Sequence, residues 1–236
     1  LGILMAPATG GGTNWPGGSY DPETNILYVS SNSSVTGLAV VPPYPGQSDM
    51  AYIQGNAATG PRTSGGAGSS VGGGRTEFSP AQRQRPQSSR GTPPIGIRVQ
   101  GLPLLKPPYG TISAIDLREG TIAWQIPHGQ TPDRVAQHPM LKGIDLPRTG
   151  QNASVGTLVT KTLLIAGEGE LTVDENGVRR AMLRAYHKTT GTEVGAVALP
   201  APQSGSPMTY MLNGEQYIVL AVSGGGYSGE LIALRL

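Results

Sequence analysis

The segment "TNWPGGSYDP", residues 13–22, places an amide, an indole ring and two glycines just before an apolar stretch. The side chain of Asn14 can donate a hydrogen bond, and the ring of Trp15 offers a large flat surface. Together they suit a flat ligand that is rich in hydrogen-bond acceptors. An indole in such a glycine-rich loop needs something to lie against. Two interpretations of Trp15 follow: it lines a ligand pocket, or it fills a core.

The histidines and serines do not form a recognisable catalytic or metal-binding pattern. No metal-ligand spacing and no nucleophile elbow is present among His128, His138, His187, Ser204, Ser206 and Ser223. We therefore expect the histidines to be surface or turn residues, and a serine hydrolase is poorly supported. The chain has no cysteine, which excludes thiolate metal sites and a cysteine nucleophile.

Several charged residues could take part in ligand or cation binding. Asp133, Glu168 and Glu170 are expected in turns; "GEGE" could bind a cation but lacks the further oxygen ligands of a calcium loop. Arg148 could pair with an anionic ligand or form a salt bridge at the rim of the fold. The sequence leaves both alternatives open.

The composition of the 236-residue chain restricts its class. Only 14% of the residues are charged, and the net charge of +2 is too small to indicate nucleic acid as a partner. The longest apolar run, residues 217–222, is far shorter than a membrane span. The N-terminal residues lack the positive start and the full apolar core of a secretory signal. Because the chain begins with Leu1, a processed or truncated N-terminus is expected.

Glycine and proline are concentrated in one region. Residues 54–97 are rich in Gly, Pro, Ser and Arg and show almost no apolar periodicity. Such a segment buries too little surface to offset its ordering entropy. We therefore expect residues 54–97 to be a mostly irregular surface segment within an insertion at about 33–108.

Outside this insertion the chain reads as short strands separated by turn residues, and no amphipathic helix of ten or more residues is evident. The sequence predicts strands at residues 26–30, 111–116, 121–126, 157–160, 163–167, 181–186, 193–199, 208–212, 217–223 and 230–236. Asn213 and Gly214, between two apolar runs, predict a type I′ hairpin turn.

A repeat underlies these strands. Each unit opens with a small-residue segment and a hairpin, as in residues 13–31, 151–169 and 204–226, and closes with a second hairpin, residues 110–127 and 180–200. The third closing segment stops at Leu236. Four antiparallel strands per repeated unit are typical of a β-propeller blade. We therefore predict an all-β chain of about three blades, with the insertion between the second and third strands of the first blade.

The first closing hairpin contains the pattern A-x-D-x-x-x-G-x-x-x-W, from Ala114 through Asp116 and Gly120 to Trp124. This pattern resembles the tryptophan-docking motif of quinoprotein dehydrogenases, whose eight-bladed propeller binds pyrroloquinoline quinone (PQQ). The segments "GGTNWPGGSYDP", "PYGTISAIDL", "VGTLVTKTLLIAGEG" and "GSPMTYMLNGEQYIVLAVSGGG" resemble, in order, the C-terminal half of that family, nearest its glucose-dehydrogenase-like branch. In the second unit His187 replaces the Asp of the motif and Gly195 replaces the Trp, so a weaker seam is expected there.

The resemblance implies a role for each candidate site residue. Trp124 would lie between adjacent blades with its N–H on a backbone acceptor. Asn14 would hydrogen-bond PQQ, and Trp15 would pack beside it. Thr157 and Met208 occupy the matching inner-strand positions of the next two blades and would line the same axial funnel.

The resemblance also implies what lies outside this chain. The catalytic base, the calcium ligands and the cation near the quinone oxygens would come from blades that precede Leu1. The whole enzyme would be periplasmic, oxidise a sugar or alcohol hydroxyl and pass electrons to a quinone or cytochrome acceptor. Two alternatives stay open: a non-catalytic propeller scaffold that shares the docking repeat, and an inactive fragment.

Overall fold

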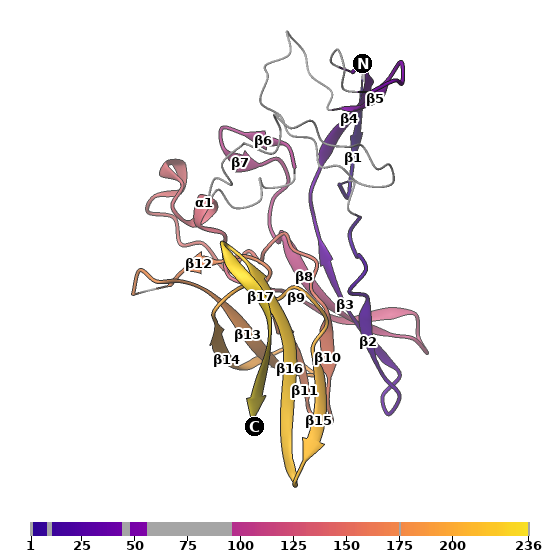
Figure 1. The fold of residues 1–236 in the computed structure, drawn as a ribbon, viewed down its shortest axis with the longest axis vertical. Coiled ribbons are helices and arrows are strands. Elements are labelled where there is room, and N and C mark those ends of the chain that lie inside the picture. The colour runs from indigo at the N-terminus through magenta and orange to yellow at the C-terminus, as the bar shows by residue number, and fades with distance from the viewer. Residues whose placement is uncertain (1, 9–10, 44–47, 56–95, 175, 236) are drawn as a thin grey trace.

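The computed structural model describes residues 2–8, 11–43, 48–55, 96–174 and 176–235. These residues form antiparallel strands almost throughout (Figure 1). The regular helices among them are one short α-helix, α1 (Asp133–Ala136), and one 3-10 turn at Pro139–Leu141. Among these residues, no helix is long and apolar enough to cross a membrane.

The first large sheet follows the predicted order of a blade. It contains β2 (Gly18–Asp21), β3 (Ile26–Asn32), β8 (Gly110–Asp116) and β9 (Thr121–Pro127), in that order and all antiparallel. The strands β3 and β8 pair along their whole length, although the chain leaves the sheet between them. Asn25, with a φ of 60°, turns the chain from β2 into β3.

The second sheet repeats this arrangement. Its strands are β10 (Thr157–Val159), β11 (Leu163–Gly167), β13 (Arg179–His187) and β14 (Glu193–Leu199). They pair in sequence order, and the short strand β12 (Thr172–Val173) adds to the beginning of β13. The predicted four-strand unit is therefore present twice.

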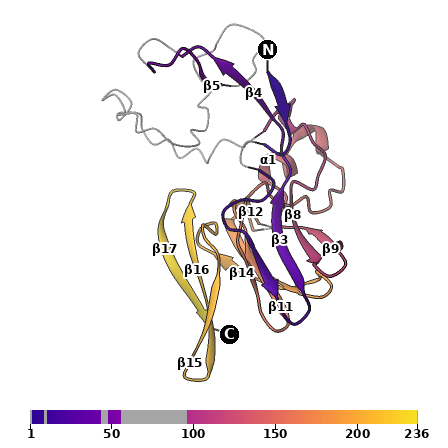
Figure 2. The same cartoon turned by 90° about the vertical axis from the view of Figure 1, so that its right-hand side faces the viewer.

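The third sheet contains β15 (Met208–Leu212), β16 (Glu215–Gly224) and β17 (Tyr227–Arg235). Asn213 and Gly214, which join β15 to β16, have φ angles of 51° and 83°. Both central residues of a type I′ turn require positive φ, so the predicted turn is confirmed. With a four-stranded, a five-stranded and a three-stranded sheet side by side (Figure 2), the prediction of a partial, all-β propeller is confirmed.

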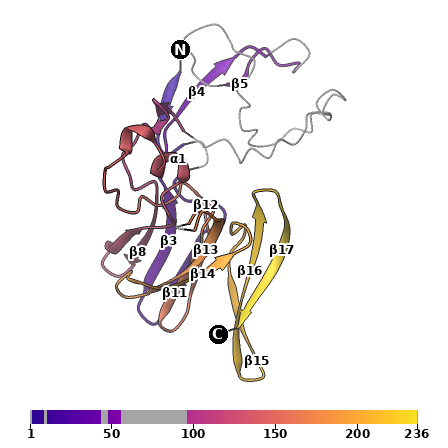
Figure 3. The ribbon, with the colours of Figure 1, turned by 90° about the vertical axis from the view of Figure 1, so that its left-hand side faces the viewer.

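The segment between β3 and β8 contains short strands that the sequence did not predict. β4 (Thr36–Val41) pairs with β1 (Ile3–Met5) on one side and β5 (Ile53–Gly55) on the other; β6 (Arg98–Val99) pairs with β7 (Leu102–Pro103). The β1–β4–β5 sheet lies at the opposite end of the molecule from the β15–β16 turn (Figures 1 and 3). Most of the segment 54–97, predicted to be irregular, lies outside the described residues.

Apolar side chains fill both seams between the three large sheets. Tyr28 and Ile112 from the first sheet pack with Leu164 and Tyr186 from the second, and all four are at most 1% exposed. Between the second and third sheets a separate cluster contains Ile165, Ala181, Leu183, Leu199, Ala201, Ile218, Leu220 and Val222. Each sheet is therefore held mainly by packing against its neighbours, as expected for a repeat architecture.

Trp124 joins the first sheet to the second. Its indole N–H donates to the carbonyl oxygen of Lys188, 3.1 Å away, in the turn after β13. Its ring packs closely on Gly191 of the same turn, where an added Cβ would lie 2.9 Å from the indole. This is the position and the kind of acceptor that the docking motif predicts.

Lys188 strengthens this seam in two further ways. The hydroxyl of Tyr28 donates to the same Lys188 carbonyl at 3.1 Å, and the Lys188 ammonium pairs with the carboxylate of Asp21 at 2.6 Å. Both members of this ion pair are buried. The hydrogen bond from Lys188 holds the pKa of Asp21 below its ordinary value. The sequence locates the turn, but not the buried pair that it carries.

In the second sheet, the position that corresponds to Trp124 has no packing partner among the described residues. Gly195, which stands where the motif would have its tryptophan, has no atom within 4 Å of the position of an added Cβ. On the same strand, Val194 and Val197 are more than half exposed. The outer part of β14 is therefore uncovered in the described structure, in contrast to the Trp124 seam.

Candidate cofactor surface

Asn14 and Trp15 form a tight turn that presents the indole to solvent. The Asn14 side-chain oxygen accepts from the Trp15 amide at 2.8 Å, and the Gly17 amide donates to the Asn14 carbonyl at 2.8 Å. Gly17 has a φ of 65°, which glycine adopts without strain. Trp15 is 97% exposed. Within the described residues, the ring of Trp15 therefore fills no core.

The chain segments that enter the three inner strands meet beside this turn. The Ser206 hydroxyl, just before β15, donates to the Pro16 carbonyl at 3.3 Å. Ser206 also packs so closely on Gly156, just before β10, that a Cβ there would clash. The side-chain amide of Gln203 donates to the Gly156 carbonyl at 2.8 Å. The Asn14–Trp15 turn thus lies next to the beginnings of both following blades.

Thr157 and Met208 differ in what they offer at this surface. The Thr157 hydroxyl is buried and lies 2.5 Å from the Ser19 hydroxyl, so it links β10 to β2. Met208 begins β15 and is 53% exposed. The structure thus gives Thr157 a positioning contact, while Met208 presents an apolar side chain to solvent. Their assignment, with Asn14 and Trp15, to a cofactor surface stays a prediction.

The groups on this turn suit PQQ chemically. PQQ is flat, anionic and rich in acceptors. The exposed indole of Trp15 offers a stacking surface, and the side-chain nitrogen of Asn14 has no hydrogen-bond partner among the described residues. An amide donor beside an aromatic face therefore fits such a group.

Arg148 does not contribute a free cation to this surface. Its guanidinium forms an ion pair with Glu193, which also accepts from Arg184 at 2.8 Å. Of the two alternatives for Arg148, the structure therefore has the salt bridge. The pair belongs to a chain of charges that runs inward through Arg184 to Glu168.

Glu168 is a buried ion-pair partner rather than a turn residue available to a cation. It is fully buried, and one of its carboxylate oxygens accepts from Arg184 at 2.7 and 2.9 Å. It also accepts from the backbone amides of Gln130 and Met182. Glu168 lies just after β11, as expected for a turn residue, and these contacts occupy both of its carboxylate oxygens with protein donors. Among the described residues, no group of three or more His, Cys, Asp or Glu side chains could hold a metal ion.

His128 follows the end of β9, as expected for a turn residue, but it is buried and not at the surface. Its Nε2 lies 3.1 Å from the Gly167 carbonyl and its Nδ1 lies 2.9 Å from the Tyr186 hydroxyl. Because a carbonyl only accepts, Nε2 carries the proton and Nδ1 accepts from Tyr186. Burial lowers the pKa of His128 to about 4. The neutral ring therefore links the first blade to the second, while His138 is partly buried and His187 is exposed.

The burial of His128 predicts an acid-sensitive seam. Between its unfolded pKa near 6.5 and its folded pKa of about 4, only the unfolded chain takes up the proton. The contribution of His128 to the unfolding free energy should be fully present above pH 6.5 and should be lost as the pH is lowered toward 4. Chemical denaturation at pH 7 and pH 5 should show a loss of about 2 kcal/mol, from about 1.4 kcal/mol per pH unit.

Two histidine variants isolate this contribution to stability. His128→Gln should remove most of the difference in unfolding free energy between pH 7 and pH 5, whatever its effect at pH 7. His187→Gln, which changes an exposed residue, should leave the difference intact. An unchanged difference in His128→Gln would contradict the assignment.

The chain matches a family model and several curated relatives. The family model described as "PQQ: Glucose/ethanol/alcohol dehydrogenase, beta-propeller domain" matches residues 1–218. The chain is 28% identical to a probable quinate dehydrogenase (quinone) of Xanthomonas campestris pv. juglandis, over 96% of this chain and 25% of the relative. It is 27% identical to the quinoprotein glucose dehydrogenase of Escherichia coli, over 97% of this chain and 25% of the relative.

A solved structure supports the same fold. The quinohemoprotein alcohol dehydrogenase from Pseudomonas putida HK5 superposes with a TM-score of 0.52 at 16% identity, over 97% of this chain and 24% of that chain. The chain thus spans about a quarter of the length of the relatives that it matches. It belongs to the family of PQQ-dependent glucose, ethanol and alcohol dehydrogenase β-propeller domains.

Proposed function

We propose that this chain forms the C-terminal quarter of a PQQ-dependent dehydrogenase. The enzyme oxidises a sugar or alcohol hydroxyl and passes the electrons to a quinone or cytochrome acceptor. The family match over residues 1–218 supports the chemical class. The names of the two relatives support a quinone-linked oxidation of a polyhydroxylated substrate. By the same family relationship, we place the enzyme in the periplasm.

The observation that carries the proposal is the exposed Asn14–Trp15 turn beside the inner strands. In the bound enzyme, the Asn14 side-chain nitrogen donates to an oxygen of the cofactor, and the Trp15 indole packs beside its ring. When bound, PQQ supplies the quinone that accepts the hydride from the substrate. Met208 covers an adjacent part of the surface and excludes water.

The remaining residues of this surface hold its shape. Thr157 and Ser19 fix β10 against β2, and the contact between Ser206 and Pro16 fixes the approach to β15. We assign the catalytic base, the calcium ligands and the cation near the quinone oxygens to blades that precede residue 1. Calcium would act there as a Lewis acid on the quinone.

Two alternatives compete with the enzyme: a non-catalytic scaffold and an inactive fragment. A scaffold requires the seams between blades, such as the Trp124 contact, but has no use for an exposed indole and an unpaired amide at its axis. Both groups are present on the Asn14–Trp15 turn. This difference favours the enzyme.

The activity test uses the complete product of the gene that carries this chain. The protein is purified without cofactor, loaded with PQQ and calcium, and assayed by dye reduction with glucose, quinate and ethanol. We expect reduction that depends on PQQ with at least one of the three. Stoichiometric PQQ binding without turnover of any substrate would favour an inactive enzyme, and the absence of PQQ binding would favour the scaffold.

A further inference from the structure

Gln203 is a buried residue whose side-chain amide makes three hydrogen bonds, all of them to backbone groups. Its Nε2 donates to the carbonyl oxygens of Gly156, 2.8 Å away, and Gly205, 2.7 Å away. Its Oε1 accepts from the backbone amide of Gly167 at 2.6 Å. An added Cβ on Gly167 would lie 2.6 Å from the same oxygen, so the side chain fits closely against β11. One side chain therefore ties together three backbone segments from the second and third sheets.

Two of these segments lead into inner strands. Gly156 directly precedes β10, and Gly205 lies three residues before the start of β15. Both of their carbonyl oxygens accept from the two hydrogens of one amide nitrogen, so a single planar group fixes the distance between them. Gln203 thus sets the spacing between the inner strands of two neighbouring blades, at the end where the Asn14–Trp15 turn lies.

The spacing that Gln203 sets reaches the Asn14–Trp15 turn through one further residue. Ser206 packs on Gly156 so closely that an added Cβ there would clash with it. The hydroxyl of Ser206 donates to the carbonyl oxygen of Pro16, the residue after Trp15, at 3.3 Å. A shift of either carbonyl that Gln203 binds would therefore move Ser206, and with it the backbone next to the indole.

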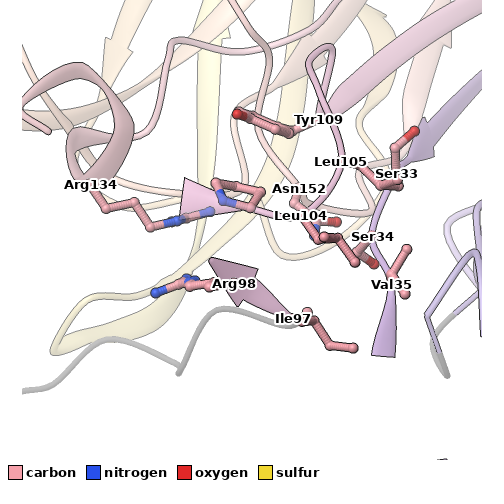
Figure 4. A pocket seen from close by; sticks show the side chains of 12 residues that line it. Ser33, Ser34, Val35, Ile97, Arg98, Leu104, Leu105, Tyr109, Arg134 and Asn152 are labelled. Atoms are coloured by element: carbon pink, nitrogen blue, oxygen red, sulfur yellow. The ribbon is translucent and has the colours of Figure 1, made fainter. Parts of the chain in front are cut away.

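The first half of the segment that enters β10 has anchors of its own. Asn152 lines a small recess at the base of the insertion, together with Ser33 and Tyr109 (Figure 4), and the recess has room for roughly one water molecule. The buried side chain of Gln151 accepts from the backbone amide of Glu170 at 3.0 Å and donates to the carbonyl oxygen of the same residue at 3.3 Å. Gln151 is therefore a second buried glutamine that bonds to backbone groups, but its partner lies between β11 and β12 and not on the approach to an inner strand.

We propose that Gln203 is a positioning residue of the cofactor site, which holds the approaches to β10 and β15 at the spacing that keeps the Asn14–Trp15 turn in place for PQQ. This inference rests on the proposed function and adds to it a residue that acts through the backbone of its neighbours. The turn keeps its own hydrogen bond between the Asn14 side chain and the Trp15 amide when Gln203 is replaced. We therefore expect the turn to be displaced and not unfolded.

Titration of PQQ into the complete, cofactor-free enzyme that carries this chain tests the assignment. Gln203→Met keeps the length of the side chain but removes all three hydrogen bonds, and it should weaken PQQ binding by about tenfold. Gln151→Met is the matched control, because it also removes a buried glutamine that bonds to the backbone. Both variants should lower the unfolding midpoint, but Gln151→Met should bind PQQ within about twofold of the parent.

A double-mutant cycle with Asn14→Ala separates positioning from a general loss of stability. If Gln203 acts by holding the turn, its replacement costs less once the turn has lost its amide donor. Gln203→Met should then weaken PQQ binding by only about threefold or less in the Asn14→Ala background. A general loss of stability would instead give about the same tenfold factor in both backgrounds.

Ser206→Ala is the second variant, and it decides the question if Gln203→Met does not fold. Ser206 is exposed, so its replacement should leave the unfolding midpoint unchanged. Because it removes the hydrogen bond to Pro16, it should weaken PQQ binding by about two- to fivefold.

The inference is overturned if Asn14→Ala weakens PQQ binding while Gln203→Met, or Ser206→Ala where Gln203→Met does not fold, binds PQQ like the parent. It is also overturned if Gln151→Met weakens binding as much as Gln203→Met, or if the effects of Gln203→Met and Asn14→Ala simply add. If Asn14→Ala itself binds PQQ like the parent, the proposed cofactor surface fails, and Gln203 then has a structural role alone.

Discussion

Trp124→Ala is expected to lower the free energy of unfolding by about 3–5 kcal/mol, the usual cost of truncating a large aromatic in a packed site. The indole fills the space above Gly191 and lies 5.8 Å, ring centre to ring centre, from Tyr28. Its loss also leaves the Lys188 carbonyl with one donor in place of two. The first seam should therefore open before the interior of either sheet.

Trp15→Ala is the matched control for this prediction. Because Trp15 is almost fully exposed, its removal should change the unfolding free energy by no more than about 0.5 kcal/mol. Urea denaturation of the parent and both variants at one protein concentration gives the comparison. Similar losses in the two variants would show that Trp124 does not join the blades.

Arg184→Ala should have a comparable effect for a different physical reason. Glu168 is fully buried, and Arg184 is its only side-chain cation among the ion pairs of the described residues. Removing one partner of a buried ion pair typically costs about 3–5 kcal/mol, because an uncompensated charge stays buried. Glu193 would also lose one of its two arginine partners.

Arg148→Ala provides the contrast within the same chain of charges. The Arg148 side chain is 37% exposed and the Glu193 side chain is 26% exposed, and pairs this close to solvent typically contribute about 0–1 kcal/mol. At pH 7, the loss of unfolding free energy relative to the parent should therefore be several-fold larger in Arg184→Ala than in Arg148→Ala. Equal, small losses would mean that Glu168 reaches water or another donor once Arg184 is removed.

The fold of the three large sheets could be predicted from sequence because each strand is short, apolar and bounded by turn residues. Asn213-Gly214 is the clearest case, since few residue pairs adopt two positive φ angles readily. The short strands of the insertion, such as β4 and β6, were missed because they are short and lack strong alternation. The pairing of β4 with the distant β1 depends on tertiary context, whereas β6 and β7 are joined locally by Gln100 and Gly101, whose φ angles are 52° and 91°.

Some of these contacts could be predicted from the sequence and others could not, and the difference has a physical reason. Trp124 is part of a spaced motif, so its neighbour and its acceptor could be anticipated. His128 and Glu168 carry no local signal of burial, because their partners Tyr186 and Arg184 come from another strand. Pairings of this kind depend on the fold and not on residue spacing.

PQQ titration of the complete, cofactor-free enzyme that carries this chain tests the central claim most directly. Asn14→Ala should weaken PQQ binding by about 1–3 kcal/mol, the cost of leaving a buried polar partner unpaired, or about five- to 150-fold in Kd. Gln125→Ala, which changes an exposed amide side chain on β9, at the opposite edge of the first sheet from β2, should bind PQQ like the parent. If Asn14→Ala also binds PQQ like the parent, the Asn14–Trp15 turn is not a cofactor surface.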